Sequence, residues 1–176
     1  MSDITQNWVE VLTPFSEGYT LKLTASEVSK KSKLPQQTAS RLLNNLVRSN
    51  LIEYVIQGKN KLFYFNLKMN QTKIIFNIVE NQKALKFLVK AKKIDVILED
   101  LLKNCESIIL FGSYASLKFD KESDLDLVVF GANRNFKKII NQYPKEINPH
   151  FIDYKNFEKL IKGKNPLTIE IMKNHV

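Results

Sequence analysis

The sequence predicts a two-domain chain of the α+β class, in which three helices and a β-hairpin precede a small α/β domain with a mixed sheet. Apolar residues recur at helical spacing in the first half, whereas from about residue 105 short β-rich runs alternate with helical stretches. A length of 176 residues is enough for two small hydrophobic cores. We therefore expect a first domain over residues 1–69, connecting helices over residues 70–104 and a second domain over residues 105–176.

Spacing and a capping motif predict the first two helices. Between Asp3 and Phe15 the apolar residues fall on one helical face, which comprises Ile4, Trp8, Val11 and Leu12. Thr24, followed three residues later by Glu27, forms a capping box, in which each side chain hydrogen-bonds to the other residue's backbone N–H. This motif predicts a second, short helix that begins at Thr24 and ends near Lys33.

A third helix and a hairpin complete the first domain. Pro35 is suited to the start of a helix, where its missing N–H costs nothing, and an apolar stripe follows: Ala39, Leu42, Leu43, Leu46 and Val47. Two β-rich runs, Leu51–Ile56 and Lys61–Leu67, are separated by a turn that contains Gly58. Three helices followed by a hairpin are typical of a winged helix.

The third helix carries hydrogen-bonding side chains on its open face, as a helix that reads the major groove of DNA does. The residues expected to contact bases are Gln36, Gln37, Ser40, Arg41 and Asn44. Those expected to contact phosphates are Arg48, Lys59 and Lys61. Double-stranded DNA is therefore an expected partner, although winged helices also serve as dimerisation or protein-docking units.

The middle of the chain reads as one or two helices, because residues 70–104 contain neither proline nor glycine and keep a helical apolar spacing. These helices either form a homodimer contact or pack the two domains together. After them the pattern changes to three expected strands, at Ser107–Phe111, Leu125–Phe130 and His150–Tyr154.

Composition limits the class of protein. The 27 Lys and Arg residues exceed the 18 Asp and Glu residues, which favours phosphate-rich partners, although a solvated lysine-rich surface would give the same count. Cys105 is the single cysteine, so an internal disulfide is excluded and a reducing compartment is expected. Neither a signal peptide nor a membrane span is recognisable, and we expect a cytoplasmic protein without membrane contact.

The most informative motif is Gly112-Ser113, followed after ten residues by Asp124-Leu125-Asp126. Side chains alternate along a strand, so Asp124 and Asp126 face one side while Leu125 faces the core. Two carboxylates at this spacing repel each other unless they hold cations, and they suit a pair of hard cations about 4 Å apart. A strand-to-helix turn at Gly112-Ser113 would present backbone N–H groups to a phosphate.

This spacing between apolar strands resembles the signature of the DNA polymerase β-like nucleotidyltransferase superfamily, over roughly residues 107–176. In that superfamily a later strand supplies a third carboxylate, and Asp153 is the best match. The resemblance implies that Asp124, Asp126 and Asp153 are catalytic and bind two Mg²⁺ ions. It further implies that Gly112 and Ser113 hold a nucleoside triphosphate (NTP). The implied reaction transfers a nucleoside monophosphate to a hydroxyl group, with pyrophosphate as the leaving group.

One departure from the superfamily pattern concerns phosphate binding. Ser116 stands where many members carry an arginine, and Lys118 or Lys121 would then supply the positive charge. A partner protein is the first expectation for the acceptor, because small members of this kind resemble antitoxins that modify a toxin. The alternative is a DNA-binding transcriptional regulator whose transferase-like domain only senses nucleotide or is inactive.

Overall fold

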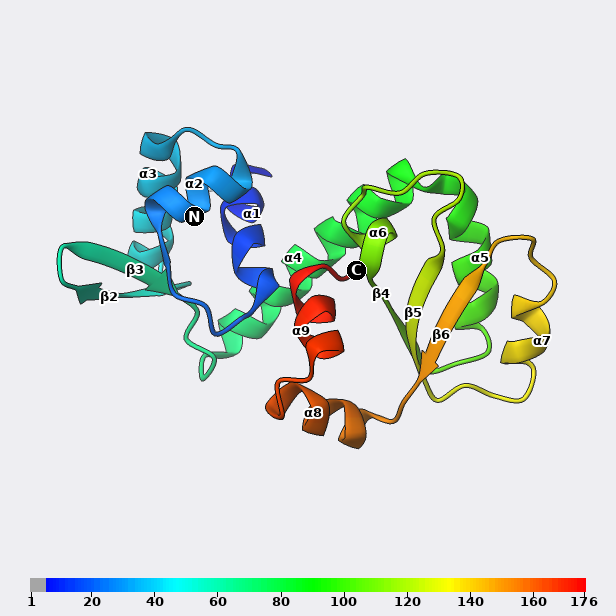
Figure 1. Cartoon of the computed structure of the whole chain (residues 1–176). Coiled ribbons are helices and arrows are strands. Elements are labelled where there is room, and N and C mark those ends of the chain that lie inside the picture. The colour runs from blue at the N-terminus through cyan, green and yellow to red at the C-terminus, as the bar shows by residue number, and fades with distance from the viewer. Residues whose placement is uncertain (1–5) are drawn as a thin grey trace. The chain divides into compact units, whose positions relative to one another are not determined.

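The structure, a computed structural model, describes residues 6–176 and divides into two compact units, Met1–Gln82 and Lys83–Val176. Unit 1 consists of helices and a small antiparallel sheet, and unit 2 has helices on both faces of a mixed sheet (Figure 1). The chain is thus a two-domain α+β protein, as the sequence predicts. The division falls inside α4 (Asn70–Lys90), so the connecting segment is shared between the two units.

Unit 1 has the element order of a winged helix. Its elements are α1 (Gln6–Leu12), the 3-10 helix η1 (Thr13–Glu17), β1 (Leu23–Thr24), α2 (Ala25–Ser32), α3 (Gln36–Arg48), β2 (Glu53–Gln57) and β3 (Asn60–Tyr64). The three strands are antiparallel in the order β1-β3-β2. The sequence did not predict η1 or β1, and the expected helical positions Asp3 and Ile4 lie outside the described residues.

Local interactions explain where these elements begin and end. The Thr24 side chain accepts the Glu27 N–H at 3.2 Å, and the Glu27 carboxylate accepts the Thr24 N–H at 2.7 Å, which confirms the capping box. Lys33 ends α2 with a φ of 58°. Pro35 directly precedes α3, and Gly58 allows the tight turn between β2 and β3 with a φ of 61°.

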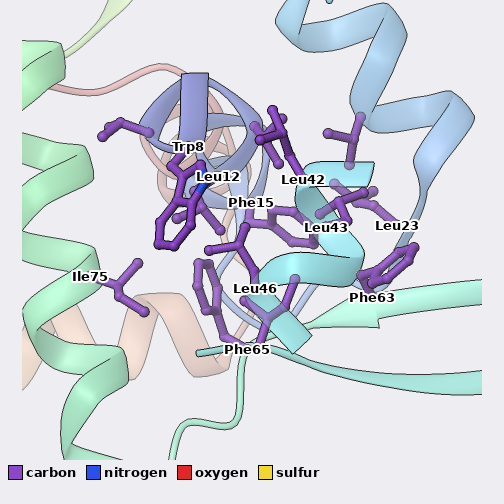
Figure 2. Packing of buried hydrophobic residues seen from close by; sticks show 14 of the residues in the cluster. Trp8, Leu12, Phe15, Leu23, Leu42, Leu43, Leu46, Phe63, Phe65 and Ile75 are labelled. Carbon is purple, nitrogen blue, oxygen red and sulfur yellow. The ribbon is translucent and has the colours of Figure 1, made fainter. Parts of the chain in front are cut away.

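The core of unit 1 lies between its three helices, its sheet and the start of α4. Figure 2 shows Trp8, Phe15, Leu46 and Phe65 converging there, and Ile75 of α4 joins the same buried cluster. The rings of Phe15 and Phe65 meet edge to face with centroids 5.4 Å apart. The first turns of α4 are therefore part of the core of unit 1 and not a separate linker.

Unit 2 is built on the three-stranded sheet β4-β5-β6, in which β4 is antiparallel and β6 parallel to the central β5. After the end of α4 its elements are α5 (Lys92–Leu102), β4 (Ser107–Leu110), α6 (Gly112–Ala115), β5 (Leu125–Phe130), α7 (Phe136–Ile140), β6 (Ile147–Phe151), α8 (Tyr154–Lys162) and α9 (Pro166–Lys173). Within residues 6–176, no helix combines the length and the apolar character that crossing a membrane requires.

The two faces of this sheet carry different helices. Leu125 and Leu127 lie in one buried cluster with residues of α5 and α7, whereas Val128 and Phe130 lie in another with residues of α8 and α9. Alternation along β5 therefore places Asp126 on the same face as Val128 and Phe130, the α8–α9 face, near the start of the strand.

The third strand of unit 2 differs from the sequence-based expectation. It spans Ile147–Phe151, whereas the expected strand was His150–Tyr154. Pro149 argues against a strand because it has no N–H for the ladder, but β6 is an edge strand, where a proline is tolerated. This shift of three residues changes which side chain of β6 lies beside the acidic pair of β5.

Candidate functional site

The two aspartates of the motif lie together at the start of β5. Asp124 directly precedes the strand and Asp126 is its second residue, and the intervening Leu125 is fully buried. Both aspartates are half-buried on the same face. The side-chain amide of Asn148, on the adjacent β6, approaches Asp124 Oδ2 at 3.4 Å and Asp126 Oδ1 at 3.5 Å. The two carboxylates therefore face one shared space.

Gly112 begins α6 directly against this pair. Its φ is 70°, a conformation that side chains disfavour, and a Cβ atom added to it would lie 2.5 Å from Asp126 Oδ2. The N–H of Phe111 donates to the backbone carbonyl of Asp126 at 3.1 Å, which fixes the strand-to-helix turn beside the carboxylate. The structure thus joins the Gly-Ser and Asp-x-Asp parts of the motif.

The other residues expected to contact nucleotide lie around α6. Ser113 is half-buried, and its carbonyl accepts hydrogen bonds from Ser116 Oγ at 3.0 Å and from the N–H of Lys118 at 3.0 Å. The Ser116 hydroxyl therefore closes a local turn, in the place where the superfamily pattern has an arginine. Lys118 and Lys121 are both exposed in the loop that leads to β5.

Asp153 does not join the aspartate pair. The register places Asn148 beside Asp126, and Asp153 follows five residues later, about 16 Å along the strand direction. Its carboxylate caps α8 by accepting the N–H of Asn156 at 2.8 Å, and this backbone hydrogen bond lowers the pKa of Asp153. The assignment of Asp153 as the third metal ligand therefore disagrees with the geometry, because the observed strand ends at Phe151, three residues before the end of the expected one.

Residues that sequence reasoning missed now lie beside the pair. Besides Asn148, Glu146 directly precedes β6, and its carbonyl accepts the N–H of Leu125 at 2.9 Å. Continuing the parallel register by one step places the exposed Glu146 beside Asp124. The spacing Glu146-x-Asn148 repeats that of Asp124-x-Asp126 and could have indicated that two polar side chains of a strand face the pair. Pro149 obscured this signal, because a proline argues against a strand.

The oxygen atoms of the aspartate pair are chemically suited to bind a hard cation such as Mg²⁺. Carboxylate oxygens are ligands that Mg²⁺ accepts in proteins, and Asp124 and Asp126 supply them, whereas Asn148 donates its amide N–H groups to both. As the side chains stand in residues 6–176, they form no group of three His, Cys, Asp or Glu residues able to hold a metal ion. The pair thus fits Mg²⁺ chemically, and a third carboxylate reaches it only if an exposed side chain such as that of Glu146 rotates.

The residues expected to contact DNA bases line one hollow on α3. This hollow has a volume of about 580 Å³, and its lining consists of Gln36, Gln37, Ser40, Arg41 and Asn44. The residues expected to contact phosphates include the exposed Arg48, at the end of α3, and the exposed Lys59, in the turn of the hairpin. All of these residues belong to unit 1.

Lys61 connects the hairpin to α3. Its ammonium group donates to Asn44 Oδ1 at 2.5 Å and lies 3.9 Å from the centroid of the Tyr54 ring. Asn44 also donates to the carbonyl of Ser40 at 2.8 Å. The side chains of Asn44 and Lys61, which sequence reasoning assigned separately to bases and phosphates, thus form one hydrogen-bonded group.

Comparison with solved structures finds two similar chains. One is the crystal structure of MepR, a transcription regulator of the Staphylococcus aureus multidrug efflux pump MepA, at 21% identity and a TM-score of 0.40 over 57% of this chain and 77% of that chain. The other is a MarR family protein from Bacillus stearothermophilus, at 24% identity and a TM-score of 0.39 over 57% of this chain and 71% of that chain. No curated protein matches the chain.

The second half of the chain has a family match that agrees with its site. The matched segment contains the Gly112-Ser113 turn, the aspartate pair on β5 and the adjacent β6. Residues 92–175 match the protein-family model described as Polymerase beta, Nucleotidyltransferase.

Proposed function

We propose that the chain is a Mg²⁺-dependent nucleotidyltransferase that moves a nucleoside monophosphate from an NTP to a hydroxyl group, with a partner protein as the first candidate acceptor. The observation that carries the proposal is the contact of Gly112 with the carboxylate of Asp126 inside the matched segment, residues 92–175. This contact joins a backbone turn suited to phosphate with a pair of carboxylates suited to a cation.

Each part of the site has a role in this proposal. Asp124 and Asp126 bind Mg²⁺, which when bound neutralises charge on the phosphates of the NTP. The first N–H groups of α6, at Gly112 and Ser113, have no partner within the helix and are suited to bind phosphate oxygens. The acceptor hydroxyl forms a bond to the α-phosphorus, and the bond to pyrophosphate breaks. Lys118 supplies the charge that Ser116 lacks, whereas Lys121, the other lysine expected there, lines a separate cavity of unit 2.

We further propose that Glu146, in place of Asp153, is the third carboxylate. Glu146 is exposed, so its side chain has room to rotate, and the register brings its backbone beside Asp124. Replacement of Glu146 by Gln should weaken Mg²⁺-dependent NTP binding, whereas replacement of Asp153 by Asn should not. The opposite result would restore the assignment of Asp153.

For unit 1 we propose binding to double-stranded DNA. The support is that the five residues expected to read bases line a single hollow on α3. Arg48, at the end of that helix, and Lys59, in the hairpin turn, are exposed, as phosphate contacts of a winged helix need to be. A homodimer would suit two-fold symmetric DNA sites, and the exposed apolar side chains Leu85 and Val89, in the part of α4 that belongs to unit 2, are candidates for its contact. Light scattering across protein concentrations tests this assembly.

A second candidate function is a DNA-binding regulator that senses nucleotide without transferring it. Two observations favour it: Asn148, and not an acid, lies opposite Asp126, and the Ser116 hydroxyl is held by the backbone of α6. An amide beside the pair still permits binding of a cation and a nucleotide, but it does not accept a proton from an acceptor hydroxyl.

One experiment separates these two functions. The protein is incubated with Mg²⁺ and labelled ATP, GTP, CTP or UTP, together with lysate protein and RNA, and the label is followed into macromolecules. Label transfer that disappears in the Asp126→Asn variant supports the transferase. Mg²⁺-dependent NTP binding without transfer supports the sensor, and the absence of both contradicts both functions.

A further inference from the structure

Unit 2 contains a second cavity, on the other face of its sheet from the aspartate pair. It has a volume of about 710 Å³, within the range of small-molecule sites. Its floor includes the buried Ile94, Ile97 and Tyr114, which belong to the same cluster as Leu125 and Leu127. Asp126 alternates with those leucines and faces the opposite side, so this cavity is distinct from the aspartate site. We call it the basic pocket.

Positive charge surrounds the basic pocket. The lysines that line it are Lys90, Lys92, Lys93, Lys121 and Lys145. The acid in the lining is Asp120, whose carboxylate is occupied by the hydroxyl of Ser123 at 2.8 Å and by its N–H at 2.9 Å. Ammonium groups gathered around one cavity repel one another, so a bound anion stabilises the arrangement.

Backbone carbonyls hold two of these lysines over the aromatic part of the floor. Lys90 donates to the carbonyl of Leu117 at 2.6 Å, and Lys145 donates to the carbonyl of Lys121 at 3.0 Å. Their ammonium groups lie 5.7 Å from the centroid of Phe119 and 5.5 Å from that of Tyr114. Neither lysine forms an ion pair with a carboxylate in the described part of the chain, so both retain capacity for an anion.

Tyr114 contributes a polar group to the lining of the basic pocket. Its exposed fraction is 4%, yet its hydroxyl forms no hydrogen bond within residues 6–176. That hydroxyl is also not sealed in the interior, because no fully buried side-chain polar atom of the described residues lacks a partner. The hydroxyl is therefore accessible from solvent, and Tyr114 is one of the residues that line the basic pocket. The Tyr114 ring stacks on Phe119 with centroids 4.3 Å apart, so the half-buried Phe119 is the more accessible aromatic ring of the floor.

We propose that the basic pocket binds a nucleoside phosphate without a divalent metal, in addition to the proposed Mg²⁺–NTP site at Asp124 and Asp126. The planar base lies against the apolar floor, of which the half-buried Phe119 is the accessible aromatic part. The phosphate binds the lysines, whose positive charge takes the place of the Mg²⁺ ion at the proposed aspartate site. Free nucleotide and the end of a single-stranded nucleic acid share this chemistry.

Calorimetric titration in EDTA tests this site in the 176-residue chain, with AMP, inorganic phosphate and a short single-stranded oligonucleotide as separate probes. AMP or the oligonucleotide should bind, and inorganic phosphate should bind more weakly because it lacks a base. The double variant Lys92→Gln/Lys93→Gln should weaken binding by about tenfold or more, the size expected for charged hydrogen bonds. Both lysines are exposed at the first turn of α5, where loss of positive charge does not harm a helix.

Two controls keep this result apart from the proposed transferase. The double variant Lys155→Gln/Lys159→Gln removes the same charge from exposed positions of α8 outside the pocket and should leave AMP binding unchanged. Asp126→Asn should also leave binding in EDTA unchanged, although it abolishes Mg²⁺-dependent NTP binding. Tyr114→Phe removes only a hydroxyl without a protein partner, so it should preserve folding and weaken AMP binding several-fold.

Three outcomes would overturn the proposal: no binding of AMP or oligonucleotide in EDTA, equal loss in the pocket and control double variants, or inorganic phosphate binding as tightly as AMP. Tighter binding of the oligonucleotide than of AMP identifies nucleic acid as the source of the nucleoside phosphate. Tighter binding of AMP identifies a free nucleotide. None of these outcomes depends on whether the aspartate pair binds a metal ion.

Discussion

Gly112 and Asp126 are in direct contact, because a Cβ atom on Gly112 would lie 2.5 Å from Asp126 Oδ2. Two requirements for glycine coincide there, since the residue also has a φ of 70°. The strand-to-helix turn and the acidic strand are therefore fitted to each other. Any side chain at Gly112 displaces the carboxylate, the backbone turn or both.

Replacement of Gly112 by Ala should abolish Mg²⁺-dependent NTP binding and destabilise unit 2. The positive φ alone costs about 1–2 kcal/mol, and the overlap with the Asp126 carboxylate adds to that cost. Calorimetry measures the NTP binding and chemical denaturation measures the free energy of unfolding.

Gly58→Ala is the matched control for that substitution. Gly58 has a similar φ of 61°, but a Cβ atom there meets nothing within 4 Å. The free energy of unfolding of the Gly58→Ala variant should therefore fall by about 1–2 kcal/mol because of backbone strain alone, and its NTP binding should be unchanged. If Gly112→Ala binds NTP as well as Gly58→Ala does, the contact with Asp126 has no part in the site.

Replacement of Asp124 or Asp126 by Asn should abolish Mg²⁺-dependent NTP binding and leave the protein folded. Removal of one charge from the pair relieves repulsion between the carboxylates, so the free energy of unfolding should stay constant or rise slightly. Titration of NTP with and without Mg²⁺ into wild type and Asp126→Asn gives four heats. Four equal heats would contradict both the transferase and the nucleotide sensor.

The sequence predicted the central strand β5 of unit 2 correctly and placed the edge strand β6 three residues too late, for a physical reason. Leu125–Phe130 is buried between two layers of helices and consists almost entirely of apolar and β-branched residues, so its pattern is strong. Ile147–Phe151 is an edge strand, and it contains Pro149 and the polar Asn148. The displacement of this weak strand led to the choice of Asp153 over the residues beside Asp124.

In unit 1 the sequence predicted the helices and the hairpin but missed the short strand β1. The capping box of Thr24 and Glu27 and the apolar stripe of α3 depend on neighbours in the chain and can be read locally. Leu23 and Thr24 form a strand only because they pair with Phe63 and Leu62, far along the chain. Pairing at such a separation leaves no local pattern in two residues.

The stability of unit 1 should fall more steeply at alkaline pH in wild type than in a Tyr19→Phe variant. Burial and the hydrogen bond to Glu80 raise the pKa of Tyr19 well above its ordinary value of 10.0. As pH rises, the hydroxyl of Tyr19 therefore loses its proton in the unfolded chain before it does so in the folded one. The contribution of Tyr19 to the free energy of unfolding is complete below about pH 10 and is lost as pH rises above that value. Urea denaturation at about pH 8 and about pH 11 measures the difference, and parallel declines would contradict this role of Tyr19.

Duplex DNA binding should weaken steeply as salt rises, because lysine and arginine contacts release counterions from phosphates. Loss of charge at Arg48 or Lys59 should weaken binding to every sequence and lower the salt slope by about 1 each. Changes at Gln37 or Arg41, which line the hollow on α3, should instead alter sequence preference. Gel-shift titrations with several duplexes, including the upstream region of the protein's own gene, measure both effects. No complex with any duplex at low salt would contradict the proposal.

A fragment of residues 1–82 should fold on its own and be more stable than a fragment of residues 3–67. The sequence alone predicts that the shorter fragment closes a core, but Ile75 and Val79 of α4 are buried in that core, with exposed fractions of 7% and 0%. The burial of each such side chain contributes about 1.5–3 kcal/mol, a large part of the stability of so small a unit. The longer fragment also keeps Phe76, whose ring meets Phe65 edge to face at 4.8 Å. Circular dichroism and urea denaturation of both fragments test this, and equal midpoints would show that the start of α4 adds nothing to unit 1.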